Sequence, residues 1–182
     1  MSFFSKTLKK CFQMRKIFPL LCVFCILFAI VTSGGGENKN ASWYYNKGAS
    51  EAVEGNLEEA IRLFKKSLKR NSHYSLAHYG LGKAYLYAGH INEAVNHLQK
   101  AADFDRRFAP SFFYLGMAYL FDKRYNAAVK AFKNAITLDP SMVEALYNIG
   151  VAYDETGRSI KARIYYEKYL YEREKKDSNI LF

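Results

Sequence analysis

The residues of this chain best suited to chemistry are its histidines, and their spacing does not fit a catalytic or metal site. His73, His78, His90 and His97 include no HExxH-type pair and have no cysteine among them. We therefore expect histidines that are packed or solvent-exposed and that bind no metal. The sequence also contains no Gly-rich phosphate loop and no nucleophile motif, so it predicts no catalytic residue, no cofactor and no enzyme.

The three cysteines lie in an N-terminal segment with the composition of a targeting signal. Residues 17–31 form an apolar run, which follows five cations and precedes small residues from Thr32 to Gly36. Cys22 and Cys25 have CxxC spacing inside this run, where we interpret them as small hydrophobic residues. Since the third, Cys11, lies before the run, the rest of the chain has no cysteine with which to form a disulfide.

Residues 1–33 are consistent with two main alternatives, a cleaved signal peptide and an uncleaved membrane anchor. A spanning helix needs about 20 apolar residues, which favours cleavage, and Ser33 is the expected last residue of the signal. Translation from Met14 would give a signal of standard proportions. Both alternatives predict an exported protein, periplasmic or otherwise extracytoplasmic, that is either secreted or tethered to the inner membrane. An organelle presequence is a third alternative. Residues 34–41 are expected to be a flexible linker.

The net charge of the whole chain, +10, comes largely from this leader. Removing the five leader cations leaves 22 basic and 17 acidic residues, a balance of +5. That balance is ordinary for a protein surface, so we predict no nucleic-acid binding.

The rest of the chain repeats with a period of 34 residues. We divide it into four units, residues 41–74, 75–108, 109–142 and 143–176, followed by a tail of residues 177–182. Such a period is typical of a stacked solenoid, in which no unit buries its apolar face alone. Two small residues recur in every unit and are predicted to allow close packing of paired helices: Gly48, Gly82, Gly116 and Gly150, and Ala60, Ala94, Ala128 and Ala162.

Apolar residues at helical spacing predict two helices in each unit, separated by a turn at Gly55, Gly89, Lys123 or Gly157. The first helices are expected at about 42–54, 75–88, 109–121 and 143–156. The second helices are expected at about 57–70, 91–104, 125–138 and 159–175.

This pattern resembles the tetratricopeptide repeat family. The clearest segments are AHYGLGKAYLYAGHINEAVNHLQKA, Ala77 to Ala101, and FFYLGMAYLFDKRYNAAVKAFKNAITLDP, Phe112 to Pro140. The resemblance implies an all-α fold, a right-handed α-solenoid of four helix-turn-helix repeats. Departures occur in the end units: Lys47 and Glu51 are polar where the family is apolar, and Tyr169 and Glu174 replace alanine and proline. We expect Tyr166, Tyr169 and Leu170 to be exposed and to allow a contact between copies or with a partner.

The resemblance also implies that the first helices line a concave groove that holds a peptide or a helical segment of another protein. The groove is apolar in the middle and acidic in the last unit, which suits an apolar segment followed by cations. We expect a non-enzymatic scaffold of the cell envelope, or alternatively a chaperone-like holder of exported or membrane proteins. The groove residues implied by the family are Tyr45, Tyr79, Lys83, Tyr87, Phe113, Met117, Phe121, Tyr147, Val151, Asp154 and Glu155.

Overall fold

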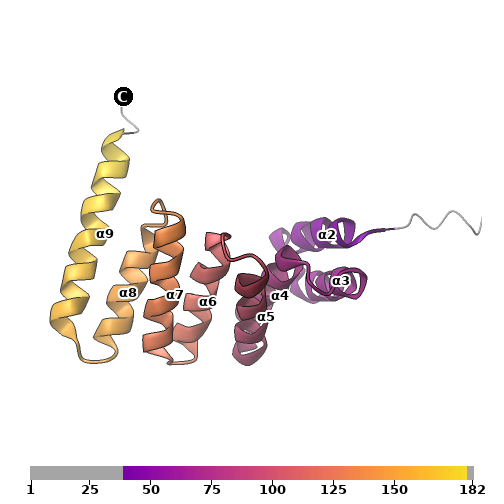
Figure 1. Cartoon of the computed structure of the whole chain (residues 1–182), viewed down its shortest axis with the longest axis horizontal. Coiled ribbons are helices and arrows are strands. Elements are labelled where there is room, and N and C mark those ends of the chain that lie inside the picture. The colour runs from indigo at the N-terminus through magenta and orange to yellow at the C-terminus, as the bar shows by residue number, and fades with distance from the viewer. Residues whose placement is uncertain (1–38, 180–182) are drawn as a thin grey trace, which may run out of the picture. The chain divides into compact units, whose positions relative to one another are not determined.

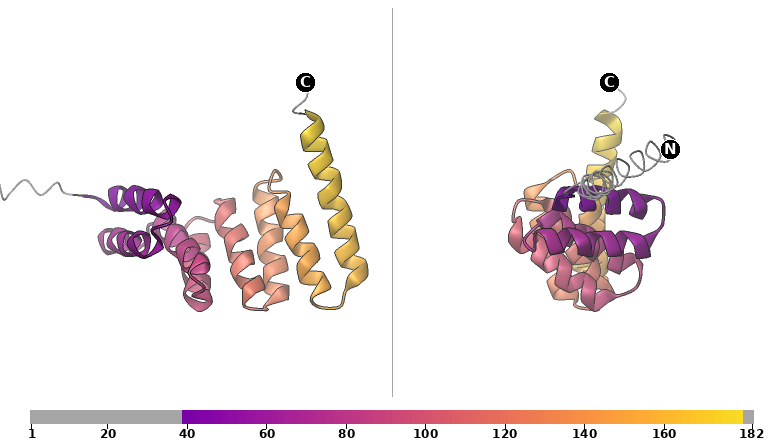
Figure 2. Two further views of the ribbon diagram at one scale, coloured as in Figure 1. Left: turned by 180° about the vertical axis from the view of Figure 1, so that it is seen from behind. Right: turned by 90° about the vertical axis from the view of Figure 1, so that its right-hand side faces the viewer.

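A computed structural model of the chain describes residues 39–179, which form eight α-helices and no strand. The predicted signal or anchor therefore lies outside the described residues, as do the last three residues of the chain. The two helices of each unit run side by side in opposite directions, and successive units pack against one another (Figures 1 and 2). Their bounds are α2 Ala41–Val53, α3 Leu57–Arg70, α4 Ser75–Tyr87, α5 Ile91–Phe104, α6 Ala109–Phe121, α7 Tyr125–Leu138, α8 Glu144–Asp154 and α9 Ser159–Asn179.

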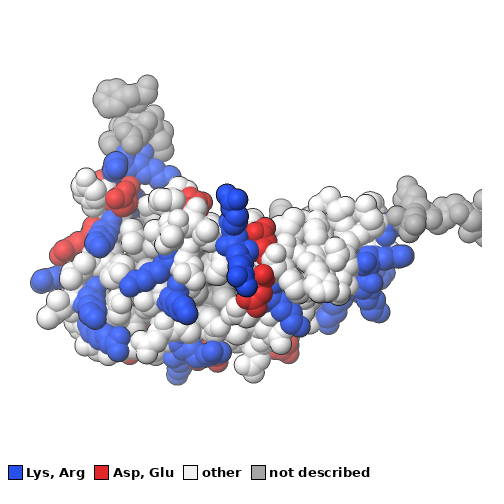
Figure 3. Space-filling view, in the orientation of Figure 1, with Lys and Arg blue, Asp and Glu red and all other residues white. Residues whose placement is uncertain are grey.

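These bounds agree with the predicted helices to within two residues, except that α9 continues through Asn179. The sequence-based expectation of an all-α solenoid of helix-turn-helix units is thus confirmed. None of the helices within residues 39–179 has an apolar stretch long enough to cross a membrane. Figure 3 shows Lys and Arg spread over one face of these units, with Asp and Glu among them.

The two helices of each unit occupy different sides of the solenoid. The first helices contact one another in succession, α2 with α4, α4 with α6 and α6 with α8. Among the described residues the second helices, α3, α5, α7 and α9, make no such contacts with each other. Closer spacing of the first helices makes their side the concave face, and the second helices form the convex face.

The apolar core consists of three clusters, each formed between neighbouring units. One joins Phe64 of α3 to Leu81 of α4, and the next joins Leu98 of α5 to Leu115 of α6. The third contains Phe132 and Ile149, both fully buried. Each unit therefore completes the core of the next, as expected for stacked repeats.

The repeat glycine provides space for a large side chain of the paired helix. A Cβ atom on Gly116 would lie 2.7 Å from Cε1 of Phe132, and one on Gly82 would lie 2.6 Å from Cγ of Leu98. The same relation joins Gly48 to Phe64 and Gly150 to Tyr166. The close approach is therefore between the glycine backbone and a side chain sixteen residues later, and the repeat alanine is buried beside it.

The turns inside the units share one backbone conformation. Gly55, Gly89 and Gly157 have φ angles of 87°, 78° and 70°, and Lys123 at the same place in the third unit has a φ of 57°. Glycine adopts this left-handed conformation without cost, while a residue with a Cβ loses about 1–2 kcal/mol there. The third unit thus keeps the turn at the expense of local strain.

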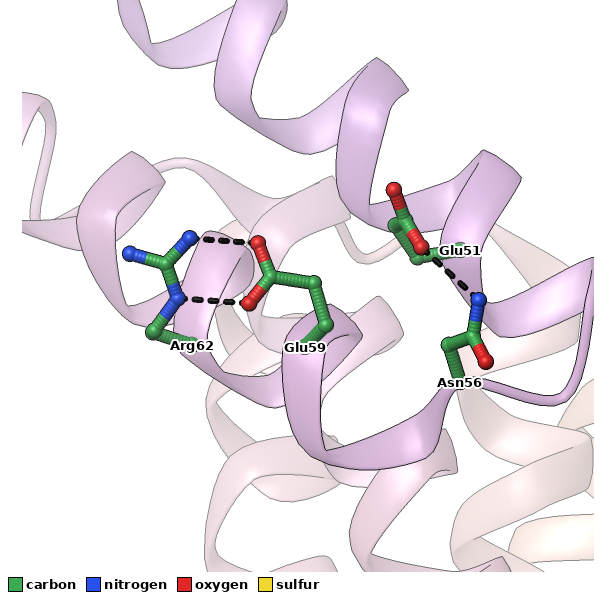
Figure 4. Close-up of polar contacts among 4 residues, drawn as sticks. All are labelled: Glu51, Asn56, Glu59 and Arg62. Carbon is green, nitrogen blue, oxygen red and sulfur yellow. Dashed lines mark hydrogen bonds and ion pairs between the residues drawn. The ribbon is translucent and has the colours of Figure 1, made fainter.

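Glu51, one of the two polar departures in the first unit, forms a local hydrogen bond, and the other, Lys47, lies over the ring of Trp43. Glu51 occupies the position of Tyr85, Tyr119 and Tyr153 in the later units, and its carboxylate accepts a bond of 3.0 Å from Nδ2 of Asn56 in the turn (Figure 4). In the following helix Arg62 donates to both carboxylate oxygens of Glu59. These contacts lie on the solvent-facing side of the first unit, where polar side chains are in contact with water and not with another unit.

The exposure expected at the last unit is wrong for two of its three residues. Tyr166 and Tyr169 are only partly exposed, because their rings pack 5.5 and 5.6 Å from the ring of Tyr147. Leu170 is 53% exposed, as expected. Both tyrosines are partly covered by Tyr147 of α8, the first helix of the same unit, and the prediction did not include this contact.

Two buried serines differ in whether the hydroxyl has a hydrogen-bond partner, so replacing each by alanine should change stability in opposite directions. Ser67 Oγ donates a 2.6 Å hydrogen bond to the carbonyl of Ala41, whereas Ser111 Oγ is buried without a partner. Ala77 and Ala145 occupy the position of Ser111 in the neighbouring units. We expect Ser111→Ala to raise the free energy of unfolding by about 1 kcal/mol and Ser67→Ala to lower it by about as much. Urea unfolding measures both; equal destabilisation by the two substitutions would contradict this description.

Candidate functional groove

The concave face contains an apolar pocket of about 280 Å³ between the first and second units. It brings together Tyr45 of α2 with Tyr79, Lys83 and Tyr87 of α4. The rest of its lining is apolar and comes from the same helices and from α3: Ala49, Ala52, Val53, Leu57, Phe64, Gly80 and Ala84. Its size suits one large side chain of a bound segment.

The tyrosines at the back of this pocket are held by other rings. Tyr45 lies edge-on to Tyr74 at 5.8 Å, and Tyr79 lies edge-on to Phe108 at 5.1 Å. Burial raises the pKa of Tyr79, and the neighbouring Tyr114 adds to the effect. Burial likewise raises the pKa of Tyr45. Both hydroxyls therefore remain protonated near neutral pH and add no charge to the pocket.

Lys83 is the cation of this pocket. Its ammonium lies 4.8 Å from the ring centroid of Tyr114 and 5.9 Å from that of Tyr87, and no described carboxylate lies within ion-pair distance. A hydrogen bond with Tyr114 raises the pKa of Tyr87, and burial adds to it. The two rings position the ammonium at the pocket and leave its charge available to a ligand.

The third unit contributes the apolar middle of the groove. Phe113 lies edge-on to Phe132 at 5.6 Å, and Met117 packs against the core. Phe121 at the end of α6 is 62% exposed, and so is Tyr87 at the same position of α4. Phe113 and Met117 thus support the groove, while Phe121 and Tyr87 present apolar surface to a ligand.

The fourth unit provides the acidic end. Tyr147 is 48% exposed and Val151 is partly buried, while Asp154 and Glu155 are exposed at the end of α8 and just beyond it. Burial raises the pKa of Tyr166, and the charge of Asp154 raises it further. Glu155 also accepts a 3.1 Å hydrogen bond from the hydroxyl of Tyr125. The carboxylate of Glu155 is therefore held toward α7, at the edge of the groove.

Sequence reasoning did not identify Gly80 and Tyr114, which occupy the same position in successive units. A Cβ on Gly80 would lie 2.7 Å from the ring of Phe64, so the glycine keeps this part of the pocket open. Asn46 and Asn148 occupy the position in the other units. Gly80 could have been noticed in the sequence, because it is a glycine at a position where no other unit has one. The role of Tyr114 could not, because its contact with Lys83 is visible only in the structure.

Two of the histidines form a hydrogen-bonded pair, in which His78 is buried and His97 is partly buried. Nε2 of His78 lies 3.1 Å from the carbonyl of Ser72 and must donate to it, so Nδ1 of neutral His78 accepts from Nδ1–H of His97 at 2.9 Å. Burial lowers the pKa of both rings, that of His97 to about 4, and the charge of His78 contributes to the latter. Within residues 39–179, no cluster of three or more His, Cys, Asp or Glu could hold a metal ion.

The helix order and the concave pocket define a helical repeat protein with a binding groove. Tetratricopeptide repeat models match residues 54–112 and 143–176, and a TPR repeat model matches residues 123–157. The chain belongs to the tetratricopeptide repeat family. Such repeats generally serve as non-enzymatic scaffolds for protein–protein interaction.

Several solved structures are similar to this chain. A crystal structure of MamA has 26% identity, covers 78% of this chain and 83% of that chain, and has a TM-score of 0.74. MamA from Desulfovibrio magneticus RS-1 has 22% identity, with coverage of 78% and 80% and a TM-score of 0.72. TTC0263, a TPR protein of Thermus thermophilus, has 21% identity, coverage of 71% and 73%, and a TM-score of 0.61. No curated protein matches the sequence significantly.

The histidine pair predicts a stability that depends on pH. Because the pKa of His97 is about 4 in the folded state and 6.5 as a reference value, the folded state binds fewer protons between these limits. The free energy of unfolding should therefore fall as pH decreases from about 6.5 to about 4. His78→Phe with His97→Leu introduces the residue types of Phe112 and Leu63, which occupy these positions in other units, and should weaken this dependence. Urea unfolding at each pH tests this, and identical pH profiles of the two proteins would contradict it.

Proposed function

We propose that this protein is a non-enzymatic scaffold of the cell envelope that binds a segment of another protein in its concave groove. The observation that carries the proposal is the exposed apolar surface on the concave side. Val53, Tyr87 and Phe121 end three successive first helices at the same repeat position, and their exposed fractions are 89%, 62% and 62%. Exposed aromatic residues beside an apolar pocket are favourable anchors for a peptide.

The charges of the groove indicate the direction and character of the bound segment. Lys83 lies at the pocket between the first two units, and Asp154 and Glu155 lie at the far end. An extended or helical segment with an apolar middle and cations toward the fourth unit complements this pattern. Association of two copies through the end of the last unit is part of the same proposal, supported by the exposed side chain of Leu170.

A chaperone-like holder is the second candidate. The apolar middle of the groove supports it, because unfolded exported or membrane proteins present apolar segments of many sequences. The two candidates differ in selectivity. A scaffold retains one or two partners and releases them to a competing peptide of matching sequence, whereas a holder suppresses aggregation of many unrelated unfolded proteins.

The envelope location rests on the leader, residues 1–33, which has the composition of a signal or anchor. We expect the protein in an extracytoplasmic fraction of its host. Mass spectrometry of the N-terminal peptide should give Gly34 as the first residue if the signal is cleaved, and Met1 or Met14 if the segment is an anchor. A protein found only in the cytoplasm would refute the envelope part of the proposal and leave the groove untouched.

Tyr87→Ala combined with Phe121→Ala should weaken capture of the native partner while helicity and thermal stability remain unchanged. Both side chains are 62% exposed, so their truncation removes ligand contacts and little core packing. We expect a loss of affinity of about tenfold or more, measured by quantitative pull-down of crosslinked partners. Asn92→Ala with Asn126→Ala, exposed on the convex side, is the matched control. Unaltered capture by the groove variant would show that the partner binds elsewhere.

A further inference from the structure

The fourth unit differs from the other three on its convex face. Three positions of the second helix are exposed in all four units. In the first three units they hold polar or charged residues, and in α9 they hold Ile160, Ile164 and Tyr171. The corresponding residues are Glu58, Asn92 and Asn126 for the first position, Arg62, Asn96 and Lys130 for the second, and Lys69, Asp103 and Thr137 for the third.

These three residues form a stripe on the outside of the solenoid. Ile160 is 75% exposed, Ile164 is 42% exposed and Tyr171 is 64% exposed. Residues 160, 164 and 171 share one face of a helix, and the stripe extends over about 17 Å. The opposite face of α9 is occupied by Ala162, Tyr165 and Tyr169, which pack on α8. The stripe therefore makes no contribution to the stacking of the units.

The other units serve as an internal control for this observation. They show that the fold accepts polar residues at all three positions, so the apolar residues are not needed for folding. Replacing three polar residues of one exposed face by large apolar ones leaves exposed apolar area of the kind that marks a protein interface. The stripe is also separate from the concave groove, because it lies on the second helix.

The two edges of the stripe carry different charges. Along one edge the ammonium groups of Lys161 and Lys168 lie 5.6 and 5.4 Å from the ring centroids of Tyr153 and Tyr165, with no described carboxylate within ion-pair distance. Along the other edge Arg163 and Glu167 form an ion pair of 3.6 Å and offset each other. Between residues 160 and 171, the charge available to a partner is therefore that of the lysine edge.

This charge pattern distinguishes between possible occupants. In a twofold-symmetric contact the same surface faces itself, so two antiparallel α9 helices would place the lysine edges of both copies together. Like charges at such close range oppose that arrangement. An acidic edge on a different helix would instead meet Lys161 and Lys168 with opposite charge.

We propose that the convex stripe of α9 is a second docking site, which binds an amphipathic helix of another protein whose apolar face is bordered by acidic residues. Ile160, Ile164 and Tyr171 bury the apolar face of that helix, and Lys161 and Lys168 pair with its acidic border. The protein thereby holds two partners at once, one in the groove and one on the convex side.

Two synthetic helical peptides test the site on the full chain. Both carry a leucine stripe; one has glutamates along one edge, and the other has lysines at the same places. On the Tyr87→Ala/Phe121→Ala variant, whose groove is weakened, fluorescence anisotropy should show binding of the acidic peptide and about tenfold or more weaker binding of the basic peptide. The triple variant Ile160→Asn, Ile164→Asn and Tyr171→Asp takes the residues of the second unit. It should bind the acidic peptide about tenfold or more weakly, because buried apolar contacts are lost.

Two further variants make the outcome specific. Lys161→Glu with Lys168→Glu should reverse the preference between the peptides, and Tyr87→Ala with Phe121→Ala should leave acidic-peptide binding unchanged. Equal binding of both peptides by the groove variant, or full binding of the acidic peptide by the triple variant, would overturn the proposal. It would also be overturned by an oligomer that dissociates in the triple variant, which would make a second copy the occupant. Binding of anionic phosphatidylglycerol vesicles that the triple variant loses would overturn it in favour of a lipid surface.

Discussion

Each unit of this solenoid depends on one contact, in which a large side chain of the second helix lies against a glycine of the first. Phe64, Leu98, Phe132 and Tyr166 take this place in successive units. A Cβ at the glycine would come closer to these side chains than atoms normally approach, so the helices of a pair could not keep their spacing. The cost of glycine inside a helix, up to about 1 kcal/mol, is offset by burial of the large side chain.

The concave groove follows from this contact. Because every pair has the same spacing, the first helices stack against one another and the second helices spread apart on the other side. Residues on the free side of the first helices are then only partly covered within the described part of the chain, which leaves Tyr87 and Phe121 62% exposed. The groove is thus a consequence of the fold, and the side chains that vary between units determine what it binds.

The 34-residue period was sufficient to predict the helices and their turns, including the turn at Lys123, which is left-handed like the others. It was not sufficient for features that occur in one unit only. Gly80 shapes the pocket because it lies over Phe64 of the preceding unit, and His78 meets His97 across two helices. These contacts join residues at repeat positions that make no such contact in the other units, so the 34-residue period does not predict them. The sequence alone did not reveal the apolar stripe on α9. An isoleucine indicates an interaction surface only at a position known to be exposed, and exposure is known only from the structure.

Site-specific photocrosslinking in the native host tests the central claim most directly. A photoreactive phenylalanine analogue at position 121 places the probe on the concave side at the middle of the groove, and the same analogue at position 130 places it on the convex side of the same unit. The account predicts a crosslink from position 121 to one protein segment with an apolar core, and none from position 130 to that segment. Crosslinks to the same segment from both positions, or from position 130 alone, would contradict the groove as the binding site.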